Sequence, residues 1–308
     1  MRFLVVAVLL AACHAAPSPS AAPSASAAEP TDPGTPAADA VVAAFADHPV
    51  VAIGEVHGST WQHQLLRDVV ADPRLAGMLD TIVVEFGSAR HQRTIDRYLA
   101  GQDVPEDELE LVWTDTTQRS GVWDAPVYRQ FYEFVRDLNA ARPRRERLRV
   151  LLGDPPIDWA GVTDLTNCSD REPRCLDYWL FRRGPHFAGV VQEAVANGHR
   201  VLVIAGSGHI RRNPDLDHAV STVDLLDANL PGSVWAMVPV EVMSDEIRRL
   251  TAAAPDAPTV FPLAGTELGA LPEDTVFQRG TVTCDPGPCE TPGPPPRLET
   301  VADALLVP

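Results

Sequence analysis

The chain has 308 residues and a mass of 33.3 kDa, enough for one large domain or two small ones. Its formal net charge is −17, and a surface this acidic repels phosphates, which argues against nucleic acid as a partner. Hydrophobic residues make up 45% and charged residues 22% of the chain, which is the composition of a folded protein.

The N-terminus has the pattern of an export signal. Arg2 gives it a positive start, and the apolar run 4–10 is too short for the roughly 20 residues that span a bilayer. The sequence Leu10-Ala11-Ala12-Cys13 resembles the lipobox of bacterial lipoproteins. This resemblance implies a signal peptide over residues 1–12 and a lipidated Cys13 that anchors the chain in a lipid bilayer. The alternative is an ordinary secretory signal in which the cysteine occurs by chance.

The segment that follows the anchor is predicted to be a disordered tether. Residues 14–39 contain six Pro, nine Ala and four Ser, and such a composition cannot bury a core. We therefore expect a tether over residues 13–39 and a single α/β domain with loop insertions over residues 40–308. By analogy with lipoprotein sorting, His14 in place of Asp after the cysteine favours the outer membrane of the cell envelope.

Four further cysteines fall into two close pairs. Export makes disulfides possible, and we predict two short-range bridges within the pairs. Four cysteines allow three pairings, and the alternative of a zinc site would require closer spacing. The pairs are Cys168 with Cys175 and Cys284 with Cys289.

From residue 50 onward, short apolar runs alternate with amphipathic stretches. Uninterrupted apolar strands with helices between them predict a largely parallel β-sheet with helices on both faces. The predicted strands are residues 50–53, 81–84, 148–152, 200–204, 233–240 and 304–307. Helices are predicted from residue 59, over 90–99, over 127–138 and over 185–196, with excursions from the sheet at 156–183 and 264–297.

Polar residues follow these strands directly. Glu55 and His57 follow the first strand, Glu85 the second, and His209 the fourth. The carboxyl ends of parallel strands share one edge of a sheet, where ligands bind. Asp154 follows the third strand, but the two prolines after it favour a turn-fixing role.

Two carboxylates and two imidazoles at one edge suit three kinds of chemistry. They could act as general acid and base on water, ligate a divalent metal, or hold a cofactor. Singly, each residue has an ordinary structural alternative: a salt bridge or helix cap for a glutamate, a buried and hydrogen-bonded ring for a histidine. Their joint placement on one edge favours a functional site.

The motifs around these residues resemble those of a known superfamily. Residues 53–58, Ile-Gly-Glu-Val-His-Gly, resemble the opening motif of the ChaN, erythromycin-esterase and TIKI superfamily. Residues 83–86 resemble its second motif, an apolar strand that ends in Glu. Residues 203–210, which end in Gly-Ser-Gly-His-Ile, are similar to the ChaN motif.

This resemblance implies two main functions. A ChaN-like lipoprotein would bind haem for iron uptake, with haem over the strand ends held by His57, His209 or Tyr128. An esterase, lactonase or metal-dependent peptidase would use Glu55, His57, Glu85 and His209 in catalysis on a small-molecule substrate. The haem-binding reading is favoured by the lipobox and the short domain, and the hydrolase reading by the carboxylates. A structural envelope protein with a degenerate pocket is the third alternative.

Overall fold

The apolar runs form a single sheet in the computed structural model, which describes residues 32–118, 121–165, 170–213, 221–277 and 294–308. All six predicted strands are confirmed, most with slightly different ends. They are β2 (Val50–Glu55), β3 (Thr81–Ser88), β4 (Arg149–Asp154), β5 (Val201–Gly206), β6 (Val234–Pro239) and β8 (Ala304–Val307).

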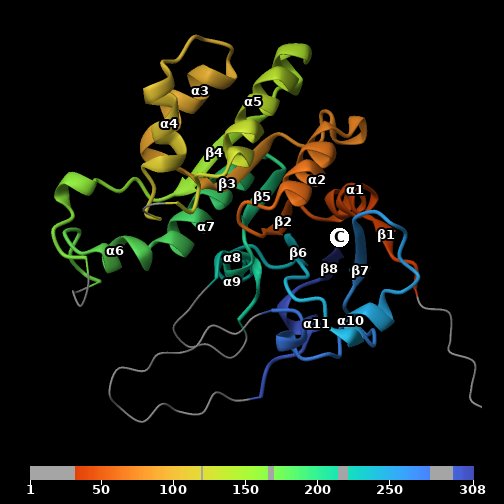
Figure 1. The fold of residues 1–308 in the computed structure, drawn as a ribbon. Coiled ribbons are helices and arrows are strands. Elements are labelled where there is room, and N and C mark those ends of the chain that lie inside the picture. The colour runs from red at the N-terminus through yellow and green to blue at the C-terminus, as the bar shows by residue number, and fades with distance from the viewer. Residues whose placement is uncertain (1–31, 119–120, 166–169, 214–220, 278–293) are drawn as a thin grey trace, which may run out of the picture. The chain divides into compact units, whose positions relative to one another are not determined.

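Two short strands that were not predicted complete the sheet. β7 (Thr259–Pro262) pairs antiparallel with β8, and β1 (Thr35–Pro36) pairs antiparallel with β7. The strand order is β1-β7-β8-β6-β2-β5-β3-β4, and all pairs from β8 to β4 are parallel. The predicted fold class, an α/β protein with a largely parallel sheet, is confirmed (Figure 1).

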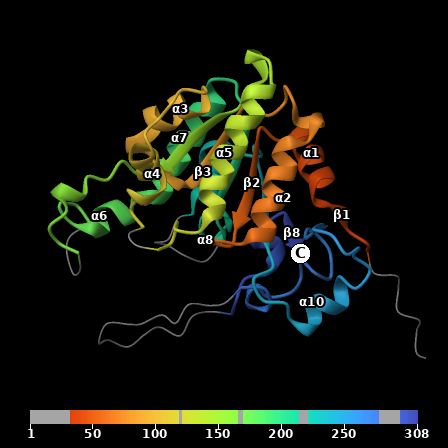
Figure 2. The same cartoon turned by 45° about the horizontal axis from the view of Figure 1, so that its top comes forward.

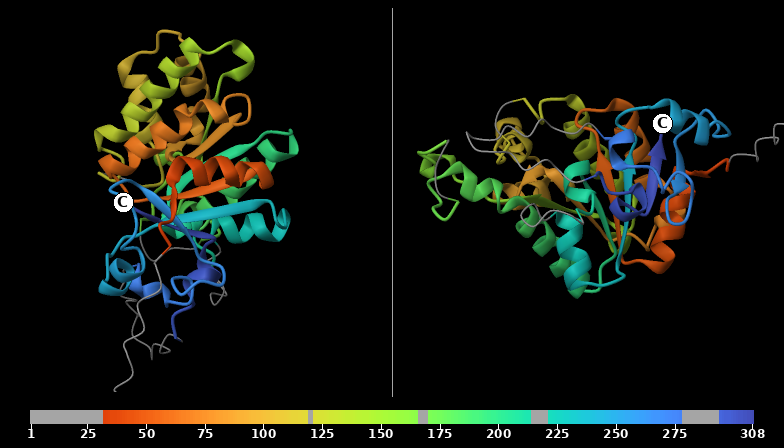
Figure 3. Two further views of the ribbon diagram at one scale, coloured as in Figure 1. Left: turned by 90° about the vertical axis from the view of Figure 1, so that its right-hand side faces the viewer. Right: turned by 90° about the horizontal axis from the view of Figure 1, so that it is seen from below.

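Helices cover both faces of the sheet because the strands are apolar on both sides. Val51 and Ile53 of β2 face a core that includes α1 (Ala37–Asp47), α2 (Thr60–Ala71) and α5 (Pro126–Ala141) (Figure 2). Val50 and Ala52 alternate with them and face the opposite core. That core includes α7 (Arg183–Ala196) and α9 (Thr222–Asn229) (Figure 3).

The remaining helices have between four and nine residues and connect or flank the strands. They are α3 (Gln92–Leu99), α4 (Glu106–Thr114), α6 (Leu176–Leu180), α8 (Ser207–Ile210), α10 (Asp245–Leu250) and α11 (Leu298–Val301). The excursion that carries α6 projects from the sheet, at the left in Figure 1. In the described ranges, no helix combines the length and the apolar character needed to cross a membrane.

The order of the strands brings the polar residues together. β2 and β3 are not neighbours, because β5 is inserted between them and pairs with both. Glu55 at the end of β2 lies in register with Gly206 at the end of β5. The carboxyl ends of β2, β5, β3 and β4 therefore form one continuous edge, as predicted.

The folded chain begins earlier than predicted. The tether was expected to run to residue 39, but Thr35–Pro36 form β1 and α1 begins at Ala37. The Ala-rich composition hid this boundary, because alanine is as suitable for a helix as for a tether. The predicted signal peptide and Cys13 lie outside the described residues and stay predictions.

Candidate active site at the carboxyl edge of the sheet

A carboxylate and an imidazole form a close pair at the end of β2. Nδ1 of His57 lies 2.5 Å from Oε2 of Glu55. The Glu55 side chain is 1% exposed and the His57 side chain 41% exposed. The chain turns sharply after this pair at Gly58, whose φ of +74° is one that residues with a side chain rarely adopt. A buried acid thus supports an accessible imidazole.

The other oxygen of Glu55 has two partners from the helices behind it. Nε2 of His63, in α2, lies 3.0 Å from Oε1, and the hydroxyl of Tyr128, in α5, donates to the same oxygen at 3.2 Å. Both side chains are fully buried. The Tyr128 hydroxyl also accepts a hydrogen bond from the Gly58 amide at 2.8 Å, which ties the turn to the same group.

These contacts set the ionisation of the pair. Burial alone would raise the pKa of Glu55, but the hydrogen bonds from His57 and His63 outweigh it and lower that pKa. Desolvation opposes a charge on His57, yet its hydrogen bond to Glu55 raises the pKa of His57 above the ordinary value. Burial and the nearby Glu55 charge raise the pKa of Tyr128, which keeps the hydroxyl protonated as a donor.

A second cluster surrounds Glu85 near the end of β3. Arg183 donates to Oε1 of Glu85, and Nε2 of His209 lies 3.4 Å from the same atom. The backbone amide of Gly206 donates to Oε2 at 2.6 Å. Burial opposes the charge on Glu85, but His209 and Arg183 hold the pKa of Glu85 well below its usual range.

Arg183 joins this cluster to Asp154 at the end of β4. Its Nε donates to Oδ1 of Asp154 at 3.1 Å, and the backbone amide of Thr117 donates to Oδ2 at 2.6 Å. Burial raises the pKa of Asp154 to about 6, against the pull of Arg183. The turn-fixing interpretation of Asp154 was therefore incomplete, since the residue is 2% exposed and its carboxylate is bonded to Arg183.

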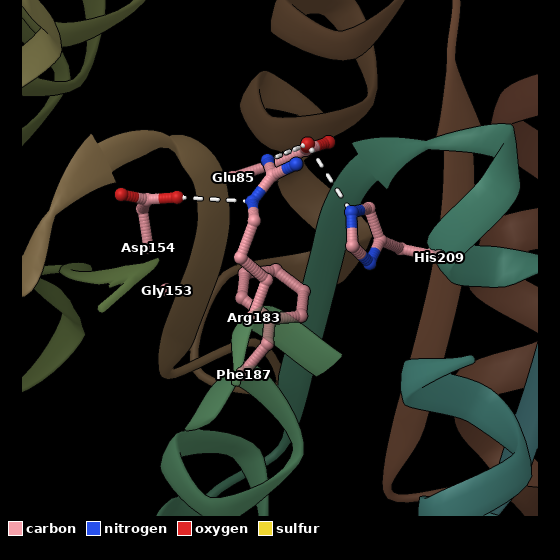
Figure 4. A pocket seen from close by; sticks show the side chains of 6 residues that line it. All are labelled: Glu85, Gly153, Asp154, Arg183, Phe187 and His209. Atoms are coloured by element: carbon pink, nitrogen blue, oxygen red, sulfur yellow. Dashed lines mark hydrogen bonds and ion pairs between the residues drawn. The ribbon is translucent and has the colours of Figure 1, made fainter. Parts of the chain in front are cut away.

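The two clusters meet over Gly206. A methyl group at this glycine would lie 2.9 Å from Cε1 of His57 and 3.2 Å from Oε2 of Glu85. The missing side chain is what allows His57 and Glu85 to approach each other above β5. Beside them lies a small pocket (Figure 4), lined by Glu85, Gly153, Asp154, Arg183, Phe187 and His209.

The structure brings Glu55, His57, Glu85 and His209 to one site, where the sequence placed them. Tyr128 lies below that site rather than on its surface, with its hydroxyl engaged by Glu55 and Gly58. Of the predicted disulfide cysteines, Cys175 is buried at the start of α6, while Cys168, Cys284 and Cys289 lie outside the described residues, so both bridges stay predictions.

Sequence reasoning missed Arg183, which contacts both carboxylates of the second cluster. It lies 98 residues from Glu85 in the chain, at the end of an excursion from the sheet, and no local pattern marks it. Thr117 and Trp123 were missed for the same reason. Trp123 packs edge-on against His57, with 4.7 Å between ring centroids.

The arrangement suits acid–base chemistry on a bound molecule. His57 has Nδ1 on a carboxylate, so Nε2 is the nitrogen left to exchange a proton with water or substrate. Arg183 supplies positive charge next to it, and the imidazole of His209 lies on the same side, 3.4 Å from Glu85. Within the described ranges, no group of three or more His, Cys, Asp or Glu side chains is arranged to hold a metal ion.

Comparisons with known proteins show the fold. No family model and no curated protein matches the sequence. A mutant of the erythromycin esterase EreC, in its open conformation, aligns with a TM-score of 0.56 and 11% identity over 87% of this chain and 92% of its own. A protein from Bacillus cereus aligns with a TM-score of 0.52 and 11% identity over 87% and 90%. The chain therefore shares the fold of the erythromycin-esterase-like proteins.

ChaN of Campylobacter jejuni, described with cofacial haem binding, is also among the similar structures. It aligns with a TM-score of 0.44 and 13% identity over 68% of this chain and 88% of its own.

Proposed function

We propose that this protein hydrolyses an ester-type bond, in an ester or a lactone, with His57 as the general base. The observation that carries this proposal is the buried Glu55 carboxylate 2.5 Å behind the accessible His57 imidazole. A general base works best when its pKa lies near the working pH, and histidine meets that requirement. The shared fold with an erythromycin esterase supports the reaction class.

In this reaction, Nε2 of His57 takes a proton from water while the water oxygen bonds to the carbonyl carbon. The negative charge that develops on the carbonyl oxygen would be stabilised by Arg183 and His209. The bond from carbon to the leaving oxygen then breaks, and that oxygen takes the proton from His57. Glu85 keeps Arg183 and His209 in place through its contacts with both.

A panel of aryl esters and lactones tests the proposal. Replacing His57 by Asn should lower kcat/KM by about 10²- to 10⁴-fold, the usual contribution of a general base. His199→Asn is the matched control, because this imidazole also faces a carboxylate, Asp80 at 4.0 Å, but at the amino ends of the strands. Full turnover by the His57 variant would contradict the proposal.

Haem binding is the other function that the resemblance implies, and the described residues fit it less well. Tyr128 is fully buried with its hydroxyl engaged, and His209 faces a small pocket lined by Glu85 and Asp154. A haemin titration followed by absorbance tests this function, and a saturable Soret shift that is lost in His209→Ala would establish it.

The place of action is a proposal from the sequence alone. With Cys13 lipidated, the enzyme would act at the cell envelope, held by a tether of Ala, Pro and Ser. Incorporation of labelled palmitate in wild type and in Cys13→Ser, compared after expression in a bacterial host, tests this step.

A further inference from the structure

Glu55, the partner of the proposed general base His57, makes further contacts that the proposed reaction does not use directly. Oε2 of Glu55 contacts His57, whereas Oε1 contacts His63 and Tyr128. A carboxylate can only accept hydrogen bonds, so Nε2 of His63 and the Tyr128 hydroxyl both donate. Each oxygen of Glu55 therefore has its own set of donors.

These two donors are held rigidly. His63 is fully buried, and its ring packs against those of Phe86, Tyr128 and Phe131, at centroid distances of 5.7, 5.1 and 6.4 Å. Tyr128 is fully buried in α5 and bonded to the Gly58 amide as well. Neither ring can turn away from Glu55 without opening the core, which makes them suited to fix a neighbour.

The turn between β2 and α2 is fixed by the residue before His63. The amide side chain of Gln62 donates to the Gly54 carbonyl and accepts from the Val56 amide at 2.8 Å. From the first turn of one helix, Gln62 thus fixes the backbone on both sides of Glu55, and His63 holds its side chain. Position and charge of Glu55 are controlled from α2 and α5 together.

We propose that His63 and Tyr128 are positioning residues, which hold Glu55 ionised and aimed at His57 by donating to its other oxygen. The inference rests on the proposed role of the Glu55–His57 pair. It predicts that the two buried donors tune how tightly the pair binds its proton. Neither residue contacts the pocket beside Glu85.

Removal of a donor should strengthen proton binding by the pair. A hydrogen-bond donor at Oε1 stabilises the negative carboxylate of Glu55. Loss of that donor therefore makes the Glu55–His57 pair more basic, whether Glu55 or His57 takes the proton. Glu85 and Arg183 also act on His57, with opposite signs, and neither changes in these variants. We expect the proton affinity to rise about threefold to tenfold for each donor removed.

The chain offers a matched control on the same helix. Tyr132 lies one turn after Tyr128 in α5, is fully buried, and donates its hydroxyl to the Phe86 carbonyl at 2.7 Å instead of to Glu55. Tyr128→Phe and Tyr132→Phe therefore remove the same atom from the same helix. Only the first of these variants removes a donor from Glu55.

The experiment is an NMR titration of the histidine rings of the full chain, with the His57 signal assigned by its loss in His57→Asn. Tyr128→Phe and His63→Leu should raise the apparent pKa of the Glu55–His57 pair. His63→Gln keeps an amide donor, so its apparent pKa should lie close to that of the wild type. Tyr132→Phe should leave the apparent pKa unchanged. If His63→Leu does not fold, Tyr128→Phe carries the test.

An unchanged or lowered pKa in Tyr128→Phe, or an equal rise in Tyr132→Phe, would overturn the inference. The titration needs no substrate, so its result is independent of the proposed hydrolysis. A protein that fails every esterase assay could still show the shift, and an active esterase could lack it.

Discussion

Arg183 is shared by two buried carboxylates, Glu85 and Asp154, through different nitrogens of its guanidinium group. Its planar fork allows this geometry, which a lysine could not reproduce. The two acids are 4% and 2% exposed, so a negative charge on either one would carry a large desolvation penalty without a cation beside it. The stability of this edge therefore depends on one side chain.

Replacing Arg183 by Met should destabilise the fold by about 3–5 kcal/mol, because it leaves two buried acids without their shared cation. The measurement is urea unfolding at pH 7 followed by circular dichroism. Arg182→Met is the matched control, since Arg182 is exposed and its guanidinium lies over the Tyr178 ring at 3.6 Å. Similar losses in both variants would contradict the special role of Arg183.

At the scale of elements, β4 and α7 are in close contact at Gly153. A methyl group at this glycine would lie 1.7 Å from two ring carbons of Phe187, in α7. Real side chains do not approach so closely, so a larger residue must push α7 away from the sheet. Because Arg183 begins the same helix, this contact also sets its distance from Asp154.

Gly153→Ala should therefore lower the free energy of unfolding by about 3 kcal/mol, at the upper end of the cost of overpacking. Gly189→Ala makes the same change within α7, where nothing lies within 4 Å, and should raise stability by about 0.5–1 kcal/mol. Thermal unfolding of both variants checks the contrast. Equal melting temperatures of the two variants would show that the close contact of Gly153 with Phe187 does not limit the size of the residue at position 153.

The elements found from the sequence are those with a strong local signal. Long apolar runs such as 201–206 predict buried strands because they must be covered on both faces. β7 has four residues and β1 only two, and each includes a proline, which removes a backbone donor. Such strands exist only because β8 offers an edge to pair with, and that edge is a property of the assembled sheet.

The same distinction applies to the site. Glu55, His57, Glu85 and His209 could be predicted because each follows a strand whose end is recognisable. The side chains that complete the site come from helices and loops, and their partners lie far away in the chain. Arg183 and Thr117 are found only when the packing of α7 and of the α4–α5 connection against the sheet is known.

For the molecule as a whole, burial of Asp154 links stability to pH. The pKa of Asp154 is about 6 in the folded protein against an ordinary value of 3.8. A folded-state pKa above the unfolded one means that the folded protein binds the proton more tightly. The stability that this provides is fully present below about pH 3.8 and is lost as the pH rises through 6.

Asp154→Asn removes this dependence, so the stability of the variant relative to wild type should improve between pH 4 and pH 7. The improvement should reach at most about 3 kcal/mol, since each pKa unit corresponds to about 1.4 kcal/mol. Urea unfolding of both proteins across this range measures it. A constant difference between the two curves would show that the pKa of Asp154 is not raised.

The insertion of β5 between β2 and β3 has a consequence for the order of events in folding. Glu55 and Glu85 are synthesised more than one hundred residues before Gly206, yet their strands cannot be brought into place until β5 separates them. Such distant pairing is slow, because a long loop must close before any contact forms. The edge that carries the candidate site is thus assembled late. Under the proposed function, recovery of activity after dilution from denaturant should lag behind recovery of helix, because the site forms only when β5 pairs with β2 and β3.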